Sequence, residues 1–192
     1  YTFMATYLDE IRKAMTLLDK EGYYFIGQTV KYSGTSMAHT IKHVSEERRI
    51  ELPVMEEVQA GIGTGLSLVG FKVLSIYPRF DFFIIALNQL INHLDKFEEM
   101  SDGQFKPKVI FRVCVGSVAP LMPGPQHCQD YYNEIKSMCK NINVVKLDRT
   151  DIVYEEYKKA VESDKSTILV EYSDLYNKDF AMTDIKQSKD IK

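Results

Sequence analysis

Two apolar runs of strand length constrain the fold more than any other feature of the chain. They are FKVLSIY at residues 71–77 and KVIFRVCV at residues 108–115, and neither shows a regular alternation of apolar and polar residues. A strand with one solvated face alternates, whereas a strand that is covered on both faces reads as a continuous apolar run. These runs therefore predict a mostly parallel sheet with helices on both of its faces.

Helices are expected to alternate with further strands along the rest of the chain. Apolar residues recur at helical spacing over residues 4–18 and 80–100, and shorter helical segments are expected at 37–44, 130–140 and 151–162. Further strands are expected in YYFIGQTV (23–30), RRIELPV (48–54), NVVKLD (143–148) and STILVEYS (166–173). The alternation predicts an α/β domain of three layers, with the sheet between two layers of helices.

The size of the chain predicts a single domain. It has 192 residues, of which 45% are hydrophobic, which is enough for one buried core and short for two. We expect this domain to cover residues 1–180. Residues 181–192 have little apolar content and are expected to form a polar tail or the stump of a linker.

Charge and cysteine usage argue against several classes of protein. Lys and Arg number 24 against 27 Asp and Glu, a net charge of −3 with no strongly basic segment, so nucleic acid is not an expected partner. The three cysteines lack CxxC spacing, which argues against a disulfide framework or a structural zinc site and fits the cytoplasm or an organelle matrix. Neither an apolar run near 18 residues nor a secretory leader is visible, so no membrane association is expected.

The stretch ELPVMEEVQAGIGTGLSLVG, residues 51–70, combines acidic residues with a run of small ones. Glu56 and Glu57 open a predicted helix, where the positive end of the helix dipole favours carboxylates, and either could accept a hydrogen bond from a bound group. Gly61 and Gly65, one turn later, would let another helix approach closely. The same pattern is also typical of a helix-capping carboxylate on a close-packed helix, and the stretch alone does not separate the two.

The segment GSVAPLMPGPQHCQ, residues 116–129, is a second candidate for function. It contains three prolines and two glycines, and long ordered loops of this kind often carry functional residues. His127 lies in it, between a predicted strand and a predicted helix, where an imidazole can be held toward a ligand. His39 is a weaker candidate, and His43 and His93 are assigned no functional role.

Taken together, these segments resemble the pyrimidine-binding domain of the transketolase superfamily, and most of all the beta subunits of thiamine-diphosphate-dependent 2-oxoacid dehydrogenases. The matching pieces are FIGQTV, LPVMEEVQAGIGTG, ALNQLIN followed by MSDGQ, KVIFRV, GPQHCQD, INVVKLD and TILVEYSDLY, in the order of the family. They cover nearly the whole chain. The resemblance implies a thiamine-diphosphate-binding fold of the pyrimidine type.

The resemblance also implies roles for individual residues. Glu56 matches the carboxylate that hydrogen-bonds the pyrimidine ring of thiamine diphosphate and activates the cofactor, which then carries the carbon chemistry. Phe82 matches the aromatic residue that packs on that ring, although a core phenylalanine is equally compatible with the sequence. His127 matches the histidine at the mouth of the active site that assists the intermediate or its acyl transfer. Gln28 stands near the cofactor where the beta subunits usually have a glutamate.

Several positions depart from the family pattern. Met55 and Val58 replace a serine and a glycine. In AVESDKST, where the family often binds a monovalent cation, Ser163 and Lys165 replace an acid and an amide, and the Lys165 ammonium either takes the place of the ion or faces solvent. The chain also lacks the GDG motif with a following asparagine that holds Mg²⁺ and diphosphate. No metal ligand is therefore assigned to this chain.

The resulting hypothesis is half of a composite active site. An alpha-type partner subunit would supply the Mg²⁺ and diphosphate ligands, and a homodimer contact is possible through the Gly61 and Gly65 helix. The reaction would be decarboxylation of a small 2-oxo acid and transfer of its acyl fragment, with the isolated chain inactive. Two alternatives are a split transketolase-like or acyloin-forming enzyme and a degenerate scaffold domain without catalysis.

Overall fold

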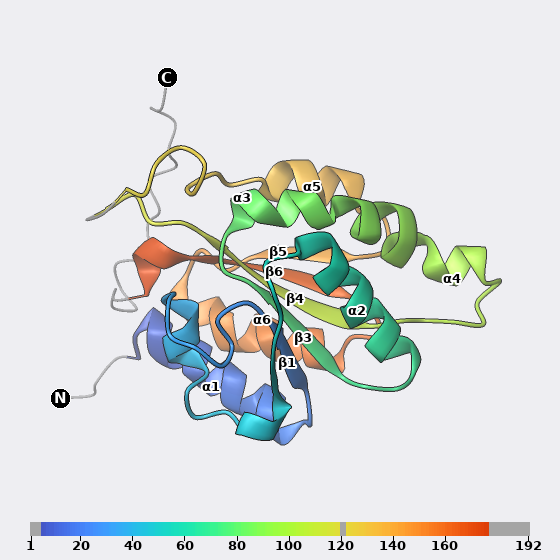
Figure 1. Cartoon of the computed structure of the whole chain (residues 1–192), viewed down its shortest axis with the longest axis horizontal. Helices are drawn as coiled ribbons and strands as arrows, with labels where there is room; N and C mark the ends of the chain where they lie inside the picture. Colours follow the sequence, from blue (N-terminus) through green and yellow to red (C-terminus); the bar gives the residue numbers. More distant parts are fainter. Residues whose placement is uncertain (1–4, 120–121, 177–192) are drawn as a thin grey trace.

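The computed structural model describes residues 5–119 and 122–176. Its centre is a sheet of six strands, all parallel, in the order β2-β1-β3-β4-β6-β5 (Figure 1). The strands are β1 (Tyr24–Gly27), β2 (Arg49–Glu51), β3 (Val73–Tyr77), β4 (Val109–Val115), β5 (Asn143–Lys146) and β6 (Thr167–Tyr172). Every residue of β3, β4 and β6 is buried, which is what their apolar sequences predicted.

Helices cover both faces of the sheet, so the predicted three-layer α/β fold is confirmed (Figure 1). One face carries α1 (Tyr7–Lys20) and α6 (Thr150–Glu162), which lie side by side. The other face carries α2 (Glu56–Leu68), α3 (Phe80–Phe83), α4 (Phe97–Met100) and α5 (Tyr132–Met138). Thr6 begins α1 with a capping box, in which its side chain and that of Asp9 each accept from the backbone of the other.

The segment predicted as one helix over residues 80–100 is helical but changes its hydrogen-bond pattern along its length. Between α3 and α4 it contains a 3-10 turn at Ile84–Ala86, a π-helix at Asn88–His93 and a second 3-10 turn at Leu94–Lys96. Hydrophobic periodicity indicates which side chains are buried. It does not indicate which backbone carbonyl accepts a hydrogen bond from each N–H, so these changes could not be predicted from it.

The first predicted strand is also shorter than expected. It ends at Gly27, which has a φ of +140°, and Thr29 has a φ of +56°, so the chain leaves the extended conformation there. A Cβ atom at Gly27 would lie 2.3 Å from the backbone oxygen of Ile76, so the neighbouring strand allows no side chain at this point. The turn places Gln28 at the end of β1.

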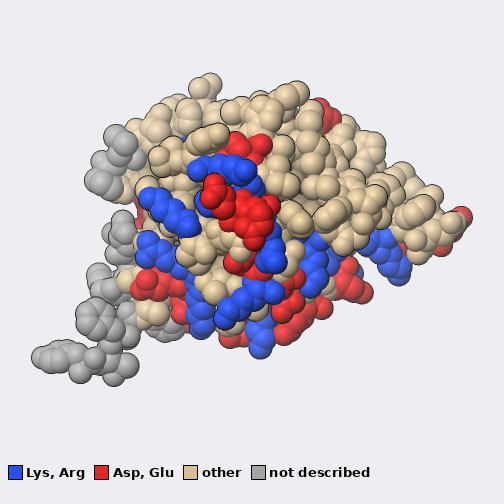
Figure 2. Space-filling model, turned by 60° about the horizontal axis from the view of Figure 1, so that its bottom comes forward, with Lys and Arg blue, Asp and Glu red and all other residues tan. Residues whose placement is uncertain are grey.

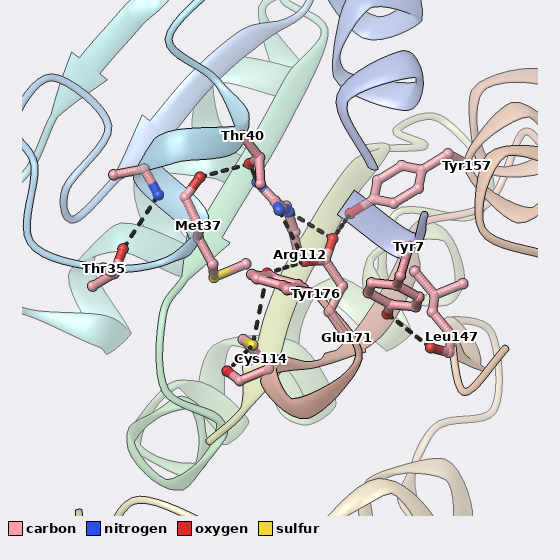
Figure 3. A network of polar contacts seen from close by, with 12 residues as sticks. Tyr7, Thr35, Met37, Thr40, Arg112, Cys114, Leu147, Tyr157, Glu171 and Tyr176 are labelled. Carbon is pink, nitrogen blue, oxygen red and sulfur yellow. Dashed lines mark hydrogen bonds and ion pairs between the residues drawn. The ribbon is translucent and has the colours of Figure 1, made fainter. Parts of the chain in front are cut away.

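A fully buried ion pair joins the centre of the sheet to the helices on one face (Figure 3). The Arg112 guanidinium on β4 donates from Nε and Nη2 to the two carboxylate oxygens of Glu171 on β6, at 2.7 and 2.8 Å. Its Nη1 donates to Thr40 Oγ1 at 2.8 Å. The hydroxyls of Tyr157 and Tyr176 donate to the same carboxylate at 2.5 and 2.6 Å. The network therefore ties together segments that are far apart in the sequence.

The environment fixes the protonation states of Arg112 and of the nearby thiol of Cys114. Burial lowers the pKa of Arg112, but the charge of Glu171 and the nearby tyrosines raise it by more, so the guanidinium stays protonated. Burial, followed by the charge of Glu171, raises the pKa of the Cys114 thiol to about 11. Cys114 is therefore a neutral thiol within the core and not a reactive thiolate.

The face formed by α1 and α6 is a mixed-charge surface. Lys and Arg side chains alternate there with Asp and Glu (Figure 2). Several are paired one helical turn apart, including Lys13 with Glu10 at 3.7 Å and Lys159 with Glu156 at 2.6 Å. This surface offers no single-sign patch to a charged partner.

Sequence predictions also concern the cysteines, membrane helices, metal clusters and the tail. All three cysteines are free, and in the described part of the chain no helix is long and apolar enough to cross a membrane. Within the same residues, no cluster of His, Cys, Asp and Glu is arranged to hold a metal ion. The predicted tail at 181–192 and the domain boundary at 180 lie outside the described residues.

Candidate functional site

The candidate site lies where neighbouring parallel strands end. Gln28 follows the last residue of β1, and Glu56 is the first residue of α2, shortly after the end of β2. The carboxyl ends of adjacent parallel strands share one edge of a sheet, and ligands of open α/β sheets bind outside that edge. Residues that are 28 positions apart in sequence are thereby brought into contact.

Glu56 is a buried carboxylate with one occupied and one available oxygen. It is 5% exposed, and its Oε1 accepts a hydrogen bond from Gln28 Nε2 at 3.1 Å. Among the described residues, no protein donor reaches its second oxygen, Oε2. The N-cap residue of α2 is Met55, and the hydrogen bond that the Glu56 side chain accepts comes from Gln28, so Glu56 does not act as a helix-capping carboxylate. A carboxylate oxygen without a protein donor can accept a hydrogen bond from a ligand, which makes Oε2 a candidate ligand-binding atom.

The neighbouring Glu57 has a different environment. It is exposed, and its Oε1 accepts from Asn88 Nδ2 at 2.9 Å and from Gln89 Nε2 at 3.4 Å. Successive helical residues point about 100° apart, so only one of the two carboxylates can face the sheet. The structure assigns that position to Glu56.

Two further buried side chains hold the start of α2 against β3. The hydroxyl of Tyr77 donates to the backbone oxygen of Glu56 at 3.1 Å. Gln59, which is 1% exposed, donates from Nε2 to Ser75 Oγ at 3.0 Å and to the Ile76 backbone oxygen at 2.9 Å. Its Oε1 is buried without a hydrogen-bond partner. The floor of the site is therefore polar and incompletely satisfied.

Phe82 and His127 form a second pair of candidate residues. Their rings meet edge to face, with centroids 5.4 Å apart. Phe82 is 37% exposed, whereas Phe80 and Phe83 on either side of it are fully buried. The alternative of a core phenylalanine thus applies to its neighbours and not to Phe82. A hydrogen bond joins Gln28 to Glu56, and a ring contact joins Phe82 to His127. Within the described residues, no hydrogen bond or ring contact connects one pair with the other.

The loop that carries His127 is held at both ends. A Cβ atom at Gly116 would lie 1.7 Å from the His127 backbone oxygen, so the two ends of the loop touch at a position open only to glycine. The carboxylate of Asp174 accepts from Ser117 Oγ at 2.5 Å, and Asp81 accepts from the Gln129 backbone N–H at 3.2 Å. The loop is thus fixed by side chains from outside it.

The remaining histidines and the predicted cation segment are separate from these pairs. His39 and His93 are exposed, and His43 shares a hydrogen bond of 2.9 Å with Thr16 Oγ1 on α1. Lys165 is exposed as well. This exposure agrees with the alternative in which the Lys165 ammonium faces solvent, and the carbonyl of Val161 accepts from the ammonium of Lys108 at 2.6 Å.

The glycines of α2 divide between two faces of the helix. Gly63 faces the sheet, where a Cβ atom would touch Ile26, Val73 and Val109 at 3.6–3.7 Å. Gly65 is exposed, with no atom within 4 Å of a Cβ placed there, and Gly61 has only Gln89 nearby, at 3.8 Å. The close packing inside this chain therefore involves Gly63, whereas Gly61 and Gly65, the two glycines predicted to contact another helix, lie on the outer side of α2.

An exposed apolar stripe runs along the outer side of α2. Met55, Val58, Ile62 and Gly65 follow one another at intervals of three or four residues, and the first three are 50%, 46% and 38% exposed. The turn at Ile84–Ala86 packs beside α2, and its Ile84 and Ile85 are exposed too. We call these six residues the α2 stripe.

Comparisons with known proteins lead to one superfamily. No protein-family model matches the chain. It is 28% identical over 150 residues to the mitochondrial pyruvate dehydrogenase E1 component subunit beta of Caenorhabditis elegans, covering 78% of this chain and 42% of that protein. It is 25% identical over 183 residues to the corresponding subunit of Rhizobium meliloti (strain 1021), covering 91% of this chain and 38% of that protein.

A solved structure shares the fold. The inactive beta4 tetramer of a split-gene transketolase aligns with a TM-score of 0.63 and 16% identity, over 85% of this chain and 49% of that chain. The chain therefore shares its fold with a transketolase and is similar in sequence to pyruvate dehydrogenase beta subunits, in agreement with the resemblance found in the sequence. The chain spans about two fifths of the length of the two beta subunits described above, 42% and 38%.

Proposed function

We propose that this chain supplies the pyrimidine-binding half of a thiamine diphosphate site that is completed by a partner subunit. The observation that carries the proposal is the buried Glu56 carboxylate, which Gln28 holds by one oxygen while the other has no donor among the described residues. The similarity to pyruvate dehydrogenase beta subunits and the position of this carboxylate at the ends of β1 and β2 support it. The test is the effect of Glu56→Gln on cofactor activation, which is argued in the Discussion.

The residues present fit a pyrimidine ring. Glu56 offers a free acceptor oxygen, and Phe82 offers a partly exposed aromatic ring with which a flat ring can pack. The orphaned Oε1 of Gln59 shows that the floor of the site also has unused hydrogen-bonding capacity. Thiamine diphosphate supplies, when bound, the nucleophilic carbon and the electron sink for a 2-oxo acid.

Gln28 and Glu56 have distinct tasks in this proposal. Glu56 exchanges a proton or a strong hydrogen bond with a ring nitrogen, which requires a carboxyl group kept away from water. Gln28 donates to the other oxygen of Glu56 and fixes the orientation of the carboxylate. Because an amide does not ionise, it cannot compete for that proton, and the departure from the usual glutamate leaves Glu56 as the single acidic group of the pair.

His127 completes the substrate side of the proposal. Its ring lies nearly perpendicular to that of Phe82, and its loop is held by Asp81 and Asp174, so the imidazole keeps a defined position. A histidine in such a position can donate a hydrogen bond or a proton to the oxygen of a small 2-oxo acid. We assign that role to His127.

The first prediction is that the isolated chain binds thiamine diphosphate weakly or not at all, and that the partner subunit restores binding. Diphosphate and Mg²⁺ provide most of the polar anchoring of such a cofactor, and the family motif that holds them is absent from this sequence. Titration calorimetry with and without partner measures the difference. A Mg²⁺-dependent micromolar affinity of the chain alone would contradict the composite site.

The second prediction concerns the α2 stripe, which we propose as a helix contact with a second copy of this chain. Gly65→Leu should abolish assembly and leave the monomer folded, because the space at Gly65 is open in the monomer and a leucine would hold two helices apart. Sedimentation velocity measures assembly, and circular dichroism measures the fold. Lys158→Leu, which adds the same side chain to exposed α6, is the matched control. Unchanged assembly of Gly65→Leu would place the contact elsewhere.

The alternative enzyme reaction is transfer of a carbon fragment to an aldehyde, as a split transketolase or an acyloin-forming enzyme would perform. The fold shared with a split-gene transketolase favours keeping this alternative. Both reactions use Glu56 in the same way, so the site residues do not separate them. Supplying the assembled enzyme with a lipoamide acceptor or an aldehyde acceptor distinguishes the two.

A further inference from the structure

Glu51, the last residue of β2, binds three successive backbone N–H groups. Its Oε1 accepts from Thr29 at 2.6 Å, and its Oε2 accepts from Val30 and from Lys31, both at 2.8 Å. Consecutive N–H groups that converge on one anion form a nest, and hydrogen bonds to a charged acceptor are stronger than neutral ones. Glu51 therefore holds the whole turn that follows β1.

This turn begins at Thr29, the residue that directly follows Gln28. Thr29 has a φ of +56°, a left-handed conformation that non-glycine residues seldom adopt, and the bonds from Glu51 hold it there. On the other side of Gln28, the backbone oxygen of Gly27 accepts from the Leu52 N–H at 2.8 Å. Gln28 is thus fixed at both neighbours, by the side chain of Glu51 and by the backbone next to it.

Glu51 is also close in sequence to Glu56, the residue that Gln28 contacts. Residues 52–55 connect it to Glu56, and Gly27 is paired with Glu51 in the sheet. We propose that Glu51 is a positioning residue that sets the contact between Gln28 and Glu56, and this inference rests on the proposed function of that pair. It adds Glu51 to the residues of the candidate site.

Asp95 provides a matched control elsewhere in the fold. Its carboxylate also accepts from three successive backbone N–H groups, those of Lys140, Asn141 and Ile142, at 3.0, 2.7 and 2.9 Å. These residues precede β5 and so lie at the amino-terminal edge of the parallel sheet, opposite the edge that carries Gln28 and Glu56. The chemistry of the two nests is alike and their locations differ.

The experiment is nuclear magnetic resonance on the full chain without ligand, comparing wild type with Glu51→Ala, Glu51→Gln and Asp95→Asn. The readout is the nuclear Overhauser effect between the Gln28 side-chain amide protons and the Glu56 Hγ protons. We expect its loss in Glu51→Ala and its weakening in Glu51→Gln, where an NH₂ group replaces one acceptor oxygen and meets N–H donors. Asp95→Asn should retain it and shift only the amides near residues 140–142.

The outcomes separate a positioning role from general stabilisation. A retained Overhauser effect in Glu51→Ala, with shifted amide signals at residues 29–31, would overturn the proposal, and so would its loss in Asp95→Asn. If Glu51→Ala does not fold, the same readout on Glu51→Gln decides. Because no cofactor is present, failure here is distinct from failure of the proposed function. If the Overhauser effect disappears in Glu51→Ala while Glu56→Gln activates the cofactor normally, the function is refuted and the positioning role stands.

Discussion

Glu56→Gln is expected to slow hydrogen–deuterium exchange at the thiazolium carbon of thiamine diphosphate by roughly 100-fold to 10,000-fold in the complex with the partner subunit, the range for positioned acid–base groups. Glutamine keeps the size of the side chain and can still accept a hydrogen bond from Gln28. It cannot share a proton with a ring nitrogen. Since Glu56 is only 5% exposed, water has little access to replace the lost carboxyl group.

Glu57→Gln is the matched control for this experiment. The same chemical change is made one residue along α2, on an exposed carboxylate that contacts Asn88 and Gln89. We expect its exchange rate to equal that of wild type. Cofactor binding measured by calorimetry should persist in both variants. Equal exchange in Glu56→Gln and wild type, or a larger loss in Glu57→Gln, would show that the carboxylate has been assigned wrongly.

The sheet could be predicted from the sequence because its central strands are buried on both faces. β3 and β4 lie within the two apolar runs, and only their first residues differ from the predicted boundaries. The π-helix at Asn88–His93 could not be predicted in this way, since it changes backbone hydrogen bonding and leaves the pattern of buried side chains intact.

The candidate site was predictable as a set of residues and not as an arrangement. Motifs nominated Gln28, Glu56, Phe82 and His127, but the contact of Gln28 with Glu56 depends on how a short turn after β1 is folded. That turn is set by Glu51, a residue whose role follows from the register of β1 with β2 and from no motif. Long-range register is the information that a local pattern lacks.

The buried network at Arg112 shows the same limit in the core. The sequence places an arginine and a glutamate within two apolar strands, but it does not show that they meet. Arg112 is aligned with Leu169, and Glu171 with Cys114, so the charged residues are diagonal neighbours on one face of the sheet. A buried charge without a partner is strongly destabilising, so the fold depends on the contact between Arg112 and Glu171.

Arg112→Met is accordingly expected to lower the free energy of unfolding by about 3–5 kcal/mol, the usual effect of removing one partner of a buried ion pair. Methionine fills much of the space but leaves the Glu171 carboxylate with only the hydroxyls of Tyr157 and Tyr176 as donors. Both charged side chains are fully buried, so water cannot solvate the carboxylate that remains. Urea denaturation measures the change.

Arg149→Met tests whether burial is the cause. Arg149 binds Asp151 with the same two-bond geometry, at 3.1 and 2.9 Å, but on the surface, and its loss should cost no more than about 1 kcal/mol. Adding Glu171→Leu to Arg112→Met should recover part of the lost stability, because it removes the uncompensated charge. Equal losses in Arg112→Met and Arg149→Met, or additive losses in the double variant, would show that the pair is not the element that holds this core together.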